Sequence, residues 1–275
     1  MGRIIAIANQ KGGVGKTTTA VNLSSALALL GRKVLVIDID PQGNATSGLG
    51  IDKNGIEATL YDVFLGVFNL TSVIVGAEQA SLWVAPANND LVGAEVELSD
   101  RPGRETILRS QLTRLREQFD YILIDCPPSL GVLTLNALVA ADSLLVPLQC
   151  EYYALEGISA LMQTVKLARQ QLNPTLALEG VVLTMYDGRT NLTRQVASEA
   201  REFFGHGVFN TIIPRNIRLS ESPSFGRPIF LYDSESAGAL AYKNLAEELE
   251  ERFENRALPP DLGAAEEKIT ANRKF

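Results

Sequence analysis

The feature that most constrains this 275-residue chain is a glycine-rich loop close to its N-terminus. The loop occupies residues 9–18 and reads N-Q-K-G-G-V-G-K-T-T. An apolar run at residues 4–8 precedes it, and an apolar-periodic stretch at residues 19–30 follows. A strand, a glycine-rich loop and a helix in this order form the local structure in which backbone amides bind phosphate. We therefore expect a phosphate-binding loop here, rather than a glycine-rich turn that binds nothing.

Each residue type in this loop suits phosphate binding. Glycine can adopt a positive φ, which lets backbone N–H groups approach phosphate oxygens closely. The helix expected to begin near Lys16 adds its partially positive N-terminal end. We expect Lys16 to neutralise charge on the β- and γ-phosphates and the Thr17 hydroxyl to ligate Mg²⁺. The expected nucleotide-binding residues of the loop are Lys11, Gly12, Gly13, Val14, Gly15, Lys16, Thr17 and Thr18.

The loop departs from the general spacing G-x-x-x-x-G-K-[ST] in two ways. Gln10 stands where the first glycine is usually found, and an additional lysine, Lys11, lies five residues before Lys16. The loop therefore fits a more restrictive pattern, K-G-G-x-G-K-[ST]-T, in which a second cation needs a function.

Apolar strand-like runs alternate with helix-like stretches along the chain. Strands are predicted at residues 4–8, 34–38, 82–85, 121–125, 143–148, 178–184 and 208–213, and helices at 16–30, 104–118, 155–171, 191–204 and 237–254. Several of these strands are apolar throughout, as expected where both faces of a sheet are covered. The pattern predicts an α/β fold with a doubly wound, mainly parallel sheet and helices on both faces. We expect residues 1–256 to form a single domain and residues 257–275 a polar, flexible tail.

Composition narrows the class of protein further. The chain is 46% hydrophobic and 21% charged, with a net charge of −7. It has no run of 18 apolar residues and no signal-peptide pattern, so neither a membrane span nor secretion is expected. Cys126 and Cys150 lie in apolar, strand-like contexts, where we expect buried free thiols in a reducing cytoplasm. Residues 181–230 are richer in arginine than the rest of this acidic chain. They could form a basic patch, or the arginines could be scattered over a solvated surface.

Carboxylates follow two predicted strands, at the sheet edge where ligands bind in open α/β folds. Asp125 ends a mostly apolar run in the Walker B pattern, and we expect it to act on Mg²⁺ directly or through water. Asp38 and Asp40 precede Pro41 and Gly43, which predict a movable loop. We expect Asp40 to orient the attacking water. We expect Asp38 either to hydrogen-bond to the groups that ligate Mg²⁺, without touching the metal itself, or to position the loop. The simpler alternative is that these aspartates only cap the helices that follow.

Five motifs, taken in order, resemble those of a known family. They are K-G-G-V-G-K-T-T, D-I-D-P-Q-G-N-A-T-S-G-L-G, I-D-C-P-P-S-L-G, Q-C-E-Y-Y-A-L-E-G and I-P-R-N-I-R-L-S-E-S-P-S-F-G. Together they resemble the ParA/Soj chromosome-partitioning ATPases, which belong to the deviant Walker A ATPases together with MinD. The resemblance extends from about residue 2 to residue 253.

This resemblance implies an ATP- and Mg²⁺-dependent ATPase that forms a sandwich homodimer when ATP is bound. It implies that Lys11 reaches the partner subunit's nucleotide, acting much like an arginine finger. Together with Lys16 and Asp40, which are expected from the residues themselves, Lys11 then completes the catalytic set. The resemblance also places Pro214 and Asn216 at the adenine.

The resemblance further implies that the ATP-bound dimer binds double-stranded DNA without sequence preference. Arg189 and Arg218 stand at the positions that match the family's DNA-binding residues. A ParB-type centromere-binding partner is expected to stimulate hydrolysis, and the protein is expected to be cytoplasmic and associated with the nucleoid.

Three related classes are the alternatives. A ParA-like ATPase that positions a protein cargo on the nucleoid would carry the same ATPase residues. A MinD-like membrane ATPase needs a basic amphipathic C-terminal helix, whereas the last predicted helix runs into E-E-L-E-E-R-F-E-N-R. An iron–sulfur ATPase needs two cysteines facing a dimer interface, and the chain has no C-x-x-C.

Overall fold

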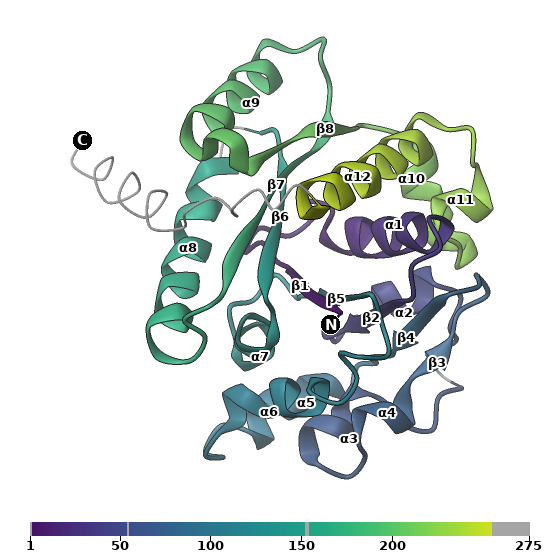
Figure 1. The fold of residues 1–275 in the computed structure, drawn as a ribbon, viewed down its shortest axis with the longest axis vertical. Helices are drawn as coiled ribbons and strands as arrows, with labels where there is room; N and C mark the ends of the chain where they lie inside the picture. Colours follow the sequence, from purple (N-terminus) through teal and green to yellow (C-terminus); the bar gives the residue numbers. More distant parts are fainter. Residues whose placement is uncertain (1, 54, 152–153, 255–275) are drawn as a thin grey trace.

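The computed structural model describes residues 2–53, 55–151 and 154–254, and these form an eight-stranded sheet with helices on both faces (Figure 1). The strand order is β3-β4-β2-β5-β1-β6-β7-β8. Among the described strands every pairing is parallel except that of β3 with β4. The predicted fold class is therefore confirmed, whereas the predicted tail at 257–275 lies outside the described residues.

The strands are β1 Arg3–Ile7, β2 Val34–Asp38, β3 Val75–Gly76, β4 Leu82–Ala85, β5 Tyr121–Asp125, β6 Ser143–Gln149, β7 Ala177–Tyr186 and β8 Val208–Pro214. The α-helices are α1 Lys16–Leu29, α2 Asn44–Gly48, α3 Leu60–Leu65, α4 Leu70–Val73, α5 Leu91–Glu97, α6 Ile107–Leu112, α7 Val132–Ala140, α8 Ala154–Gln171, α9 Asn191–Phe204, α10 Ile217–Glu221, α11 Ile229–Tyr232 and α12 Ala237–Glu254. Short 3₁₀ helices are η1 Arg104–Thr106, η2 Gly205–Gly207 and η3 Ser222–Phe225.

All seven predicted strands are present, but the helix predicted at 104–118 needs correction, and several short helices, of which α7 is the longest, were not predicted. The helix predicted at 104–118 is a 3₁₀ turn followed by α6, which ends at Leu112. Beyond it the backbone tightens, because Leu115 N–H donates to Leu112 O and Gln118 N–H donates to Leu115 O. Helix α7 was not predicted, because nearly all of its residues are buried and its sequence V-L-T-L-N-A-L-V-A has no polar face to give a helical period.

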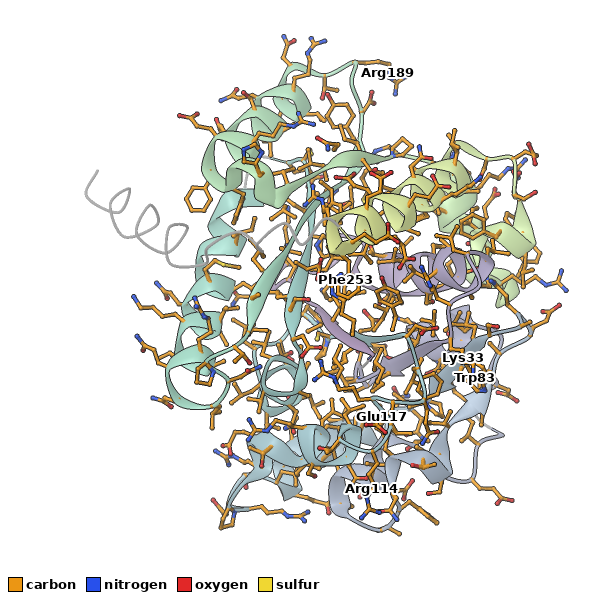
Figure 2. All side chains as sticks on the ribbon, viewed as in Figure 1. Lys33, Trp83, Arg114, Glu117, Arg189 and Phe253 are labelled. Atoms are coloured by element: carbon orange, nitrogen blue, oxygen red, sulfur yellow. The ribbon has the colours of Figure 1, made fainter. Side chains whose placement is uncertain are left out.

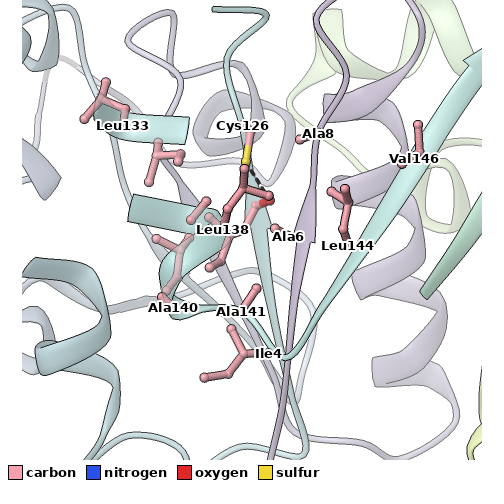
Figure 3. Packing of buried hydrophobic residues seen from close by; sticks show 14 of the residues in the cluster. Ile4, Ala6, Ala8, Cys126, Leu133, Leu138, Ala140, Ala141, Leu144 and Val146 are labelled. Atoms are coloured by element: carbon pink, nitrogen blue, oxygen red, sulfur yellow. Dashed lines mark hydrogen bonds between the residues drawn. The ribbon is translucent and has the colours of Figure 1, made fainter. Parts of the chain in front are cut away.

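Side chains alternate between two cores, one on each face of the sheet. In β1 and the residue after it, Ile4, Ala6 and Ala8 face the core that packs against α7, whereas Ile5 and Ile7 face the core beneath α1 and α12. Figure 3 shows the first of these cores, in which small residues of the central strands lie close to the leucines of α7.

Both cysteines belong to the core on the α7 side and are buried free thiols, as predicted. The Cys126 thiol contacts the Ile124 carbonyl oxygen at 3.7 Å (Figure 3). A cluster shared between two subunits would need thiols at the surface, so the burial of Cys126 and Cys150 argues against the iron–sulfur alternative.

The parallel register brings the expected site together at one sheet edge. Ile7 pairs with Asp125 in the β1–β5 ladder, and Asp38 pairs with Asp125 in the β2–β5 ladder. The chain enters the glycine-rich loop directly after β1, so both aspartates lie next to the start of that loop. Among the described helices, none is long and apolar enough to cross a membrane.

Candidate active site at the carboxyl edge of the sheet

The glycine-rich loop joins β1 to α1 and uses positive φ angles at two of its glycines. Gly13 has a φ of 73°, and Gly15, which caps the N-terminus of α1, has a φ of 90°. Gly12 does not have a positive φ, although its residue type would allow one. The first turn of α1 closes when Thr19 N–H donates to Gly15 O at 2.8 Å. The loop therefore ends at the N-terminus of α1, where free backbone N–H groups can bind phosphate.

Two side chains hold the loop against the neighbouring strands. Asn9 is buried; it donates to Pro147 O of β6 at 2.8 Å and accepts from Lys11 N–H at 3.0 Å. The Thr184 hydroxyl of β7 donates to Val14 O at 2.8 Å. Sequence reasoning did not single out Asn9 or Thr184, although a polar residue near the end of an apolar strand is a usable signal. These bonds fix the loop before any ligand binds.

Lys16 lies at the centre of the site and is only 6% exposed. Its ammonium group donates to Lys11 O at 3.2 Å. Burial lowers the pKa of Lys16 below its usual value, and the charges of Asp125 and Asp40 oppose that shift. An ammonium group that burial has partly stripped of water favours contact with a strong anion such as a triphosphate.

Asp125 is fully buried, and neither of its carboxylate oxygens accepts a hydrogen bond of ordinary geometry from the described residues. Burial raises its pKa well above the usual value, the Asp38 carboxylate raises it further, and the nearby Thr17 hydroxyl lowers it. A buried carboxylate without a partner is costly, and a hard cation with oxygen ligands would relieve that cost. Asp125 and Thr17 therefore fit the expected Mg²⁺ site.

Asp38 is also fully buried but has its partners within the chain. It accepts hydrogen bonds from Thr46 N–H at 2.7 Å, from the Thr46 hydroxyl at 2.8 Å and from Asp40 N–H at 3.2 Å. The Thr46 hydroxyl in turn accepts from Ala87 N–H at 3.0 Å. Burial raises the pKa of Asp38 to about 6, although the bonds from Thr46 oppose the rise. Since Thr46 lies in the first turn of α2, Asp38 both caps that helix and holds the loop that carries Asp40.

Asp40 lies just beyond β2 and is 8% exposed. Its Oδ1 accepts from Gln42 N–H at 2.9 Å, which leaves the other oxygen for a ligand. Its role in orienting water stays a prediction.

Lys11 is the loop's second lysine, and its side chain is 32% exposed. Its ammonium group pairs with Glu151, which follows β6, at 3.3 Å. Lys11 thus points to the surface while Lys16 points inward, so the two lysines of the loop are in different environments.

Pro214 and Asn216 lie at the same sheet edge but farther along it. Pro214 ends β8 opposite Tyr186 of β7, and the Asn216 side chain caps α10 by accepting from Leu219 N–H at 3.2 Å. Strand β8 is three strand spacings from β1, or about 14 Å. This separation suits the two ends of an extended nucleotide, and the adenine contact stays a prediction.

Arg189 and Arg218 are exposed, with 87% and 52% of their side chains accessible, but both are paired with local carboxylates. Arg189 is labelled in Figure 2 at the turn after β7, and its guanidinium group donates two hydrogen bonds to Asp187, at 2.8 and 2.6 Å. Arg218 lies 2.9 Å from Glu221 and 3.2 Å from Asp233. Within the described residues, neither arginine forms an ion pair with the phosphate loop. Any basic patch here is therefore weaker than counting arginines suggests.

Comparison with known proteins gives consistent matches. Residues 2–178 match the model of a family described as an AAA domain. The chain is 54% identical over 249 residues to the sporulation initiation inhibitor protein Soj of Bacillus subtilis, covering 90% of this chain and 98% of that protein. It is 55% identical over 252 residues to the chromosome partitioning protein ParA of Myxococcus xanthus, covering 92% and 89%.

Solved structures share the fold. The chain is similar to the crystal structure of cobyrinic acid a,c-diamide synthase from Mycobacterium smegmatis with bound ADP and magnesium, with a TM-score of 0.83 and 39% identity. That similarity covers 94% of this chain and 98% of the other.

The Thr184–Val14 bond predicts a loss of nucleotide affinity on substitution. Thr184→Val keeps the side-chain shape but leaves Val14 O without its donor, a loss worth about 1–2 kcal/mol. We expect MgADP to bind about tenfold more weakly, measured by isothermal titration calorimetry. Thr164→Val on α8, away from the loop, is the control and should bind as the wild type does. Equal affinities for all three proteins would contradict the anchoring role of Thr184.

The burial of Asp38 predicts a pH effect on stability in nucleotide-free protein with EDTA. The folded pKa of about 6 exceeds the unfolded value of about 3.9, so the folded state holds this proton to higher pH. The contribution of Asp38 to stability therefore falls as pH rises from about 4 to about 6, by on the order of 2–3 kcal/mol.

Asp38→Asn should reduce the fall in the free energy of unfolding, as measured by urea unfolding at pH values from 4.5 to 6.5, and leave the part that the raised pKa of Asp125 contributes. The exposed Asp100→Asn is the matched control and should keep the wild-type slope. If Asp38→Asn also keeps the wild-type slope, the burial of Asp38 is not the cause of the pH effect.

Proposed function

The chain belongs to the ParA/Soj family of chromosome-partitioning ATPases, and on that premise we propose that it is an ATP-driven DNA-partitioning switch. Its ATP-bound homodimer binds double-stranded DNA without sequence preference. Hydrolysis, stimulated by a ParB-type partner, releases the DNA, and the protein acts in the cytoplasm on the nucleoid. The observation that carries the proposal is the pairing of an inward lysine, Lys16, with an outward one, Lys11, in a single phosphate loop.

Hydrolysis depends on groups already in place at the sheet edge. Loop amides and Lys16 hold the phosphates, and Asp40 orients a water whose oxygen attacks the γ-phosphorus. The bond to the β–γ bridging oxygen breaks and leaves ADP and inorganic phosphate. When bound, Mg²⁺ neutralises phosphate charge, and Thr17 and Asp125 are the residues that would hold it. The ADP and magnesium of the Mycobacterium smegmatis structure support the binding of a nucleotide with Mg²⁺ by this fold.

Lys11 gives the switch its dependence on a second subunit. In the single chain it is held by Glu151 in a partly exposed pair, and such pairs contribute about 0–1 kcal/mol. A triphosphate on the partner subunit is a stronger site for this ammonium group than one exposed carboxylate. Dimerisation is therefore favoured by the γ-phosphate and is lost when hydrolysis removes it.

DNA binding would use the exposed arginines in the same way. The pairs of Arg189 with Asp187 and of Arg218 with Glu221 are exposed, so duplex phosphates can replace the carboxylates at small cost. A dimer presents each arginine twice, which links DNA affinity to ATP. With a net charge of −7, the chain must bind DNA through a local surface, and the affinity should fall steeply with salt.

DNA retention by the purified protein tests the proposal. We expect retention with ATP, and none with ADP or without nucleotide, in a low-salt filter-binding or biolayer interferometry assay. Arg189→Glu or Arg218→Glu should weaken retention about tenfold or more, because each change removes a phosphate contact from both subunits.

Arg114→Glu is the matched control for this charge reversal. Figure 2 shows Arg114 at the end of the molecule opposite Arg189, on an exposed part of the chain after α6. It should leave retention unchanged. Retention that does not depend on ATP, or that all three reversals weaken alike, would refute a specific ATP-dependent DNA surface.

Two further variants separate the proposed steps. Lys11→Ala should bind ATP but lose ATP-dependent dimerisation, because only the contact across the interface is removed. Asp40→Ala should accumulate the ATP-bound dimer without turnover. Analytical ultracentrifugation with ATP, combined with phosphate release, distinguishes the two, and Lys16→Ala, which should not bind nucleotide, is the negative control. Normal ATP hydrolysis by Asp40→Ala would rule out its role in orienting water.

A further inference from the structure

Two segments far apart in the sequence meet backbone to backbone at Gly50 and Gly226. Gly50 follows α2 with a φ of 85°, and Gly226 follows η3 with a φ of 64°. A Cβ added to Gly50 would lie 3.1 Å from Gly226 O. A Cβ added to Gly226 would lie 3.2 Å from Ser47 O and 3.4 Å from Gly50 Cα. A side chain at either position would fit only if the opposite backbone moved by a few tenths of an ångström, so the contact is tight and is made of backbone alone.

The first segment connects this contact to Asp40 through successive backbone hydrogen bonds. Gly43 N–H donates to Asp40 O at 2.8 Å, Ser47 N–H donates to Gly43 O at 3.1 Å, and Gly50 N–H donates to Ser47 O at 3.0 Å. Asp38 holds the middle of the segment through Thr46. A change at Asp40 is therefore linked to Gly50 by one continuous series of turns, residues 40–50.

The second segment, residues 217–233, is held together by its own side chains. Arg218 contacts Glu221 and Asp233, and the Tyr232 hydroxyl donates to Glu221 at 3.0 Å. The ring of Tyr232 also stacks on Phe225, with centroids 5.0 Å apart. These contacts join α10, η3 and α11 into one unit, and it carries Arg218.

Helix α1 contacts both segments and so provides a common support. Its buried Asn22 accepts from Ile229 N–H at 2.7 Å and donates to Thr18 O at 2.8 Å. On the other side, Gly48 of α2 lies against Val21, where an added Cβ would come within 3.2 Å. Figure 1 shows α10 and α11 next to one end of α1. Both segments are therefore held against the same helix, next to the contact in which they meet each other.

We propose that the Gly50–Gly226 contact is a conformational joint through which the loop carrying Asp40 sets the position of residues 217–233. The state of the γ-phosphate site is then transmitted to the surface that carries Arg218. The link to DNA rests on the proposed function, but the joint itself does not. Because tightly packed backbone segments do not deform easily, a small shift of residues 47–50 must be accompanied by a shift of residues 217–233.

Hydrogen–deuterium exchange of the full chain tests the joint without DNA. Wild-type protein is compared with MgADP and with a non-hydrolysable ATP analogue and Mg²⁺. We expect exchange to differ between these states at residues 39–50 and also at 217–233, by about fivefold or more. In Gly226→Ala the difference at 39–50 should remain, and the difference at 217–233 should be lost.

Gly31→Ala is the matched control. Gly31 has a φ of 82°, but an added Cβ would have no heavy atom within 4 Å, so this variant adds backbone strain without crowding. It should keep both nucleotide-dependent differences. Gly50→Ala, which crowds the same contact from the other side, serves where Gly226→Ala does not fold.

The outcomes separate the joint from a purely structural contact. A structural contact would make Gly226→Ala less stable but leave its response at 217–233 dependent on the nucleotide, and that result would overturn the proposal. A wild-type protein with no nucleotide-dependent difference at 217–233 would also overturn it. If the joint responds as expected but wild-type DNA retention does not depend on ATP, the proposed function fails and the joint stands.

Discussion

The site depends on the cost of keeping Lys16, Asp38 and Asp125 buried next to one another. Both carboxylates are inaccessible and Lys16 is nearly so. Buried charges are stable only when they are paired or hydrogen-bonded. The chain meets this requirement for Asp38 through Thr46 and in part for Lys16 through Lys11 O, but not for Asp125. The unmet part is what a nucleotide with its metal would supply, so binding is coupled to stability.

The free-energy cost of burying these charged groups also explains why the two loops around them are held in place by hydrogen bonds. A loop that moved freely would let water reach Lys16 and weaken its attraction to phosphate. Asn9 and Thr184 prevent this by fixing the loop to β6 and β7, and Asp38 fixes the next loop through Thr46. The loop carrying Asp40 is then free to respond only as a unit, which is the condition under which the Gly50–Gly226 contact could transmit a signal.

Local pattern was enough to predict the parts of the site that are continuous in sequence. The glycine loop, the start of α1 and the position of Asp125 at a strand end all follow from short-range rules, and the parallel sheet follows from alternation. The Thr184–Val14 bond joins residues 170 positions apart, and no local pattern contains it. The Gly50–Gly226 contact and the pairing of Arg218 with Asp233 were missed for the same reason. Helix α7 was missed because uniform burial removes the helical period on which prediction relies.

The ionic groups divide into two sets that match their proposed tasks. Groups assigned to the subunit's own nucleotide, such as Lys16 and Asp125, are buried and fixed. Of the cations assigned to another molecule, Arg189 and Arg218 are exposed and Lys11 is partly exposed, and each is held by a carboxylate of the same chain. Exposed pairs are weak and readily exchanged, so they keep a cation oriented without competing strongly with phosphate. A buried pair could not serve in this way, because breaking it would leave a desolvated charge behind. In the proposed switch, accessibility of these cations is therefore a requirement, since each would leave its carboxylate when ATP is bound and return after hydrolysis.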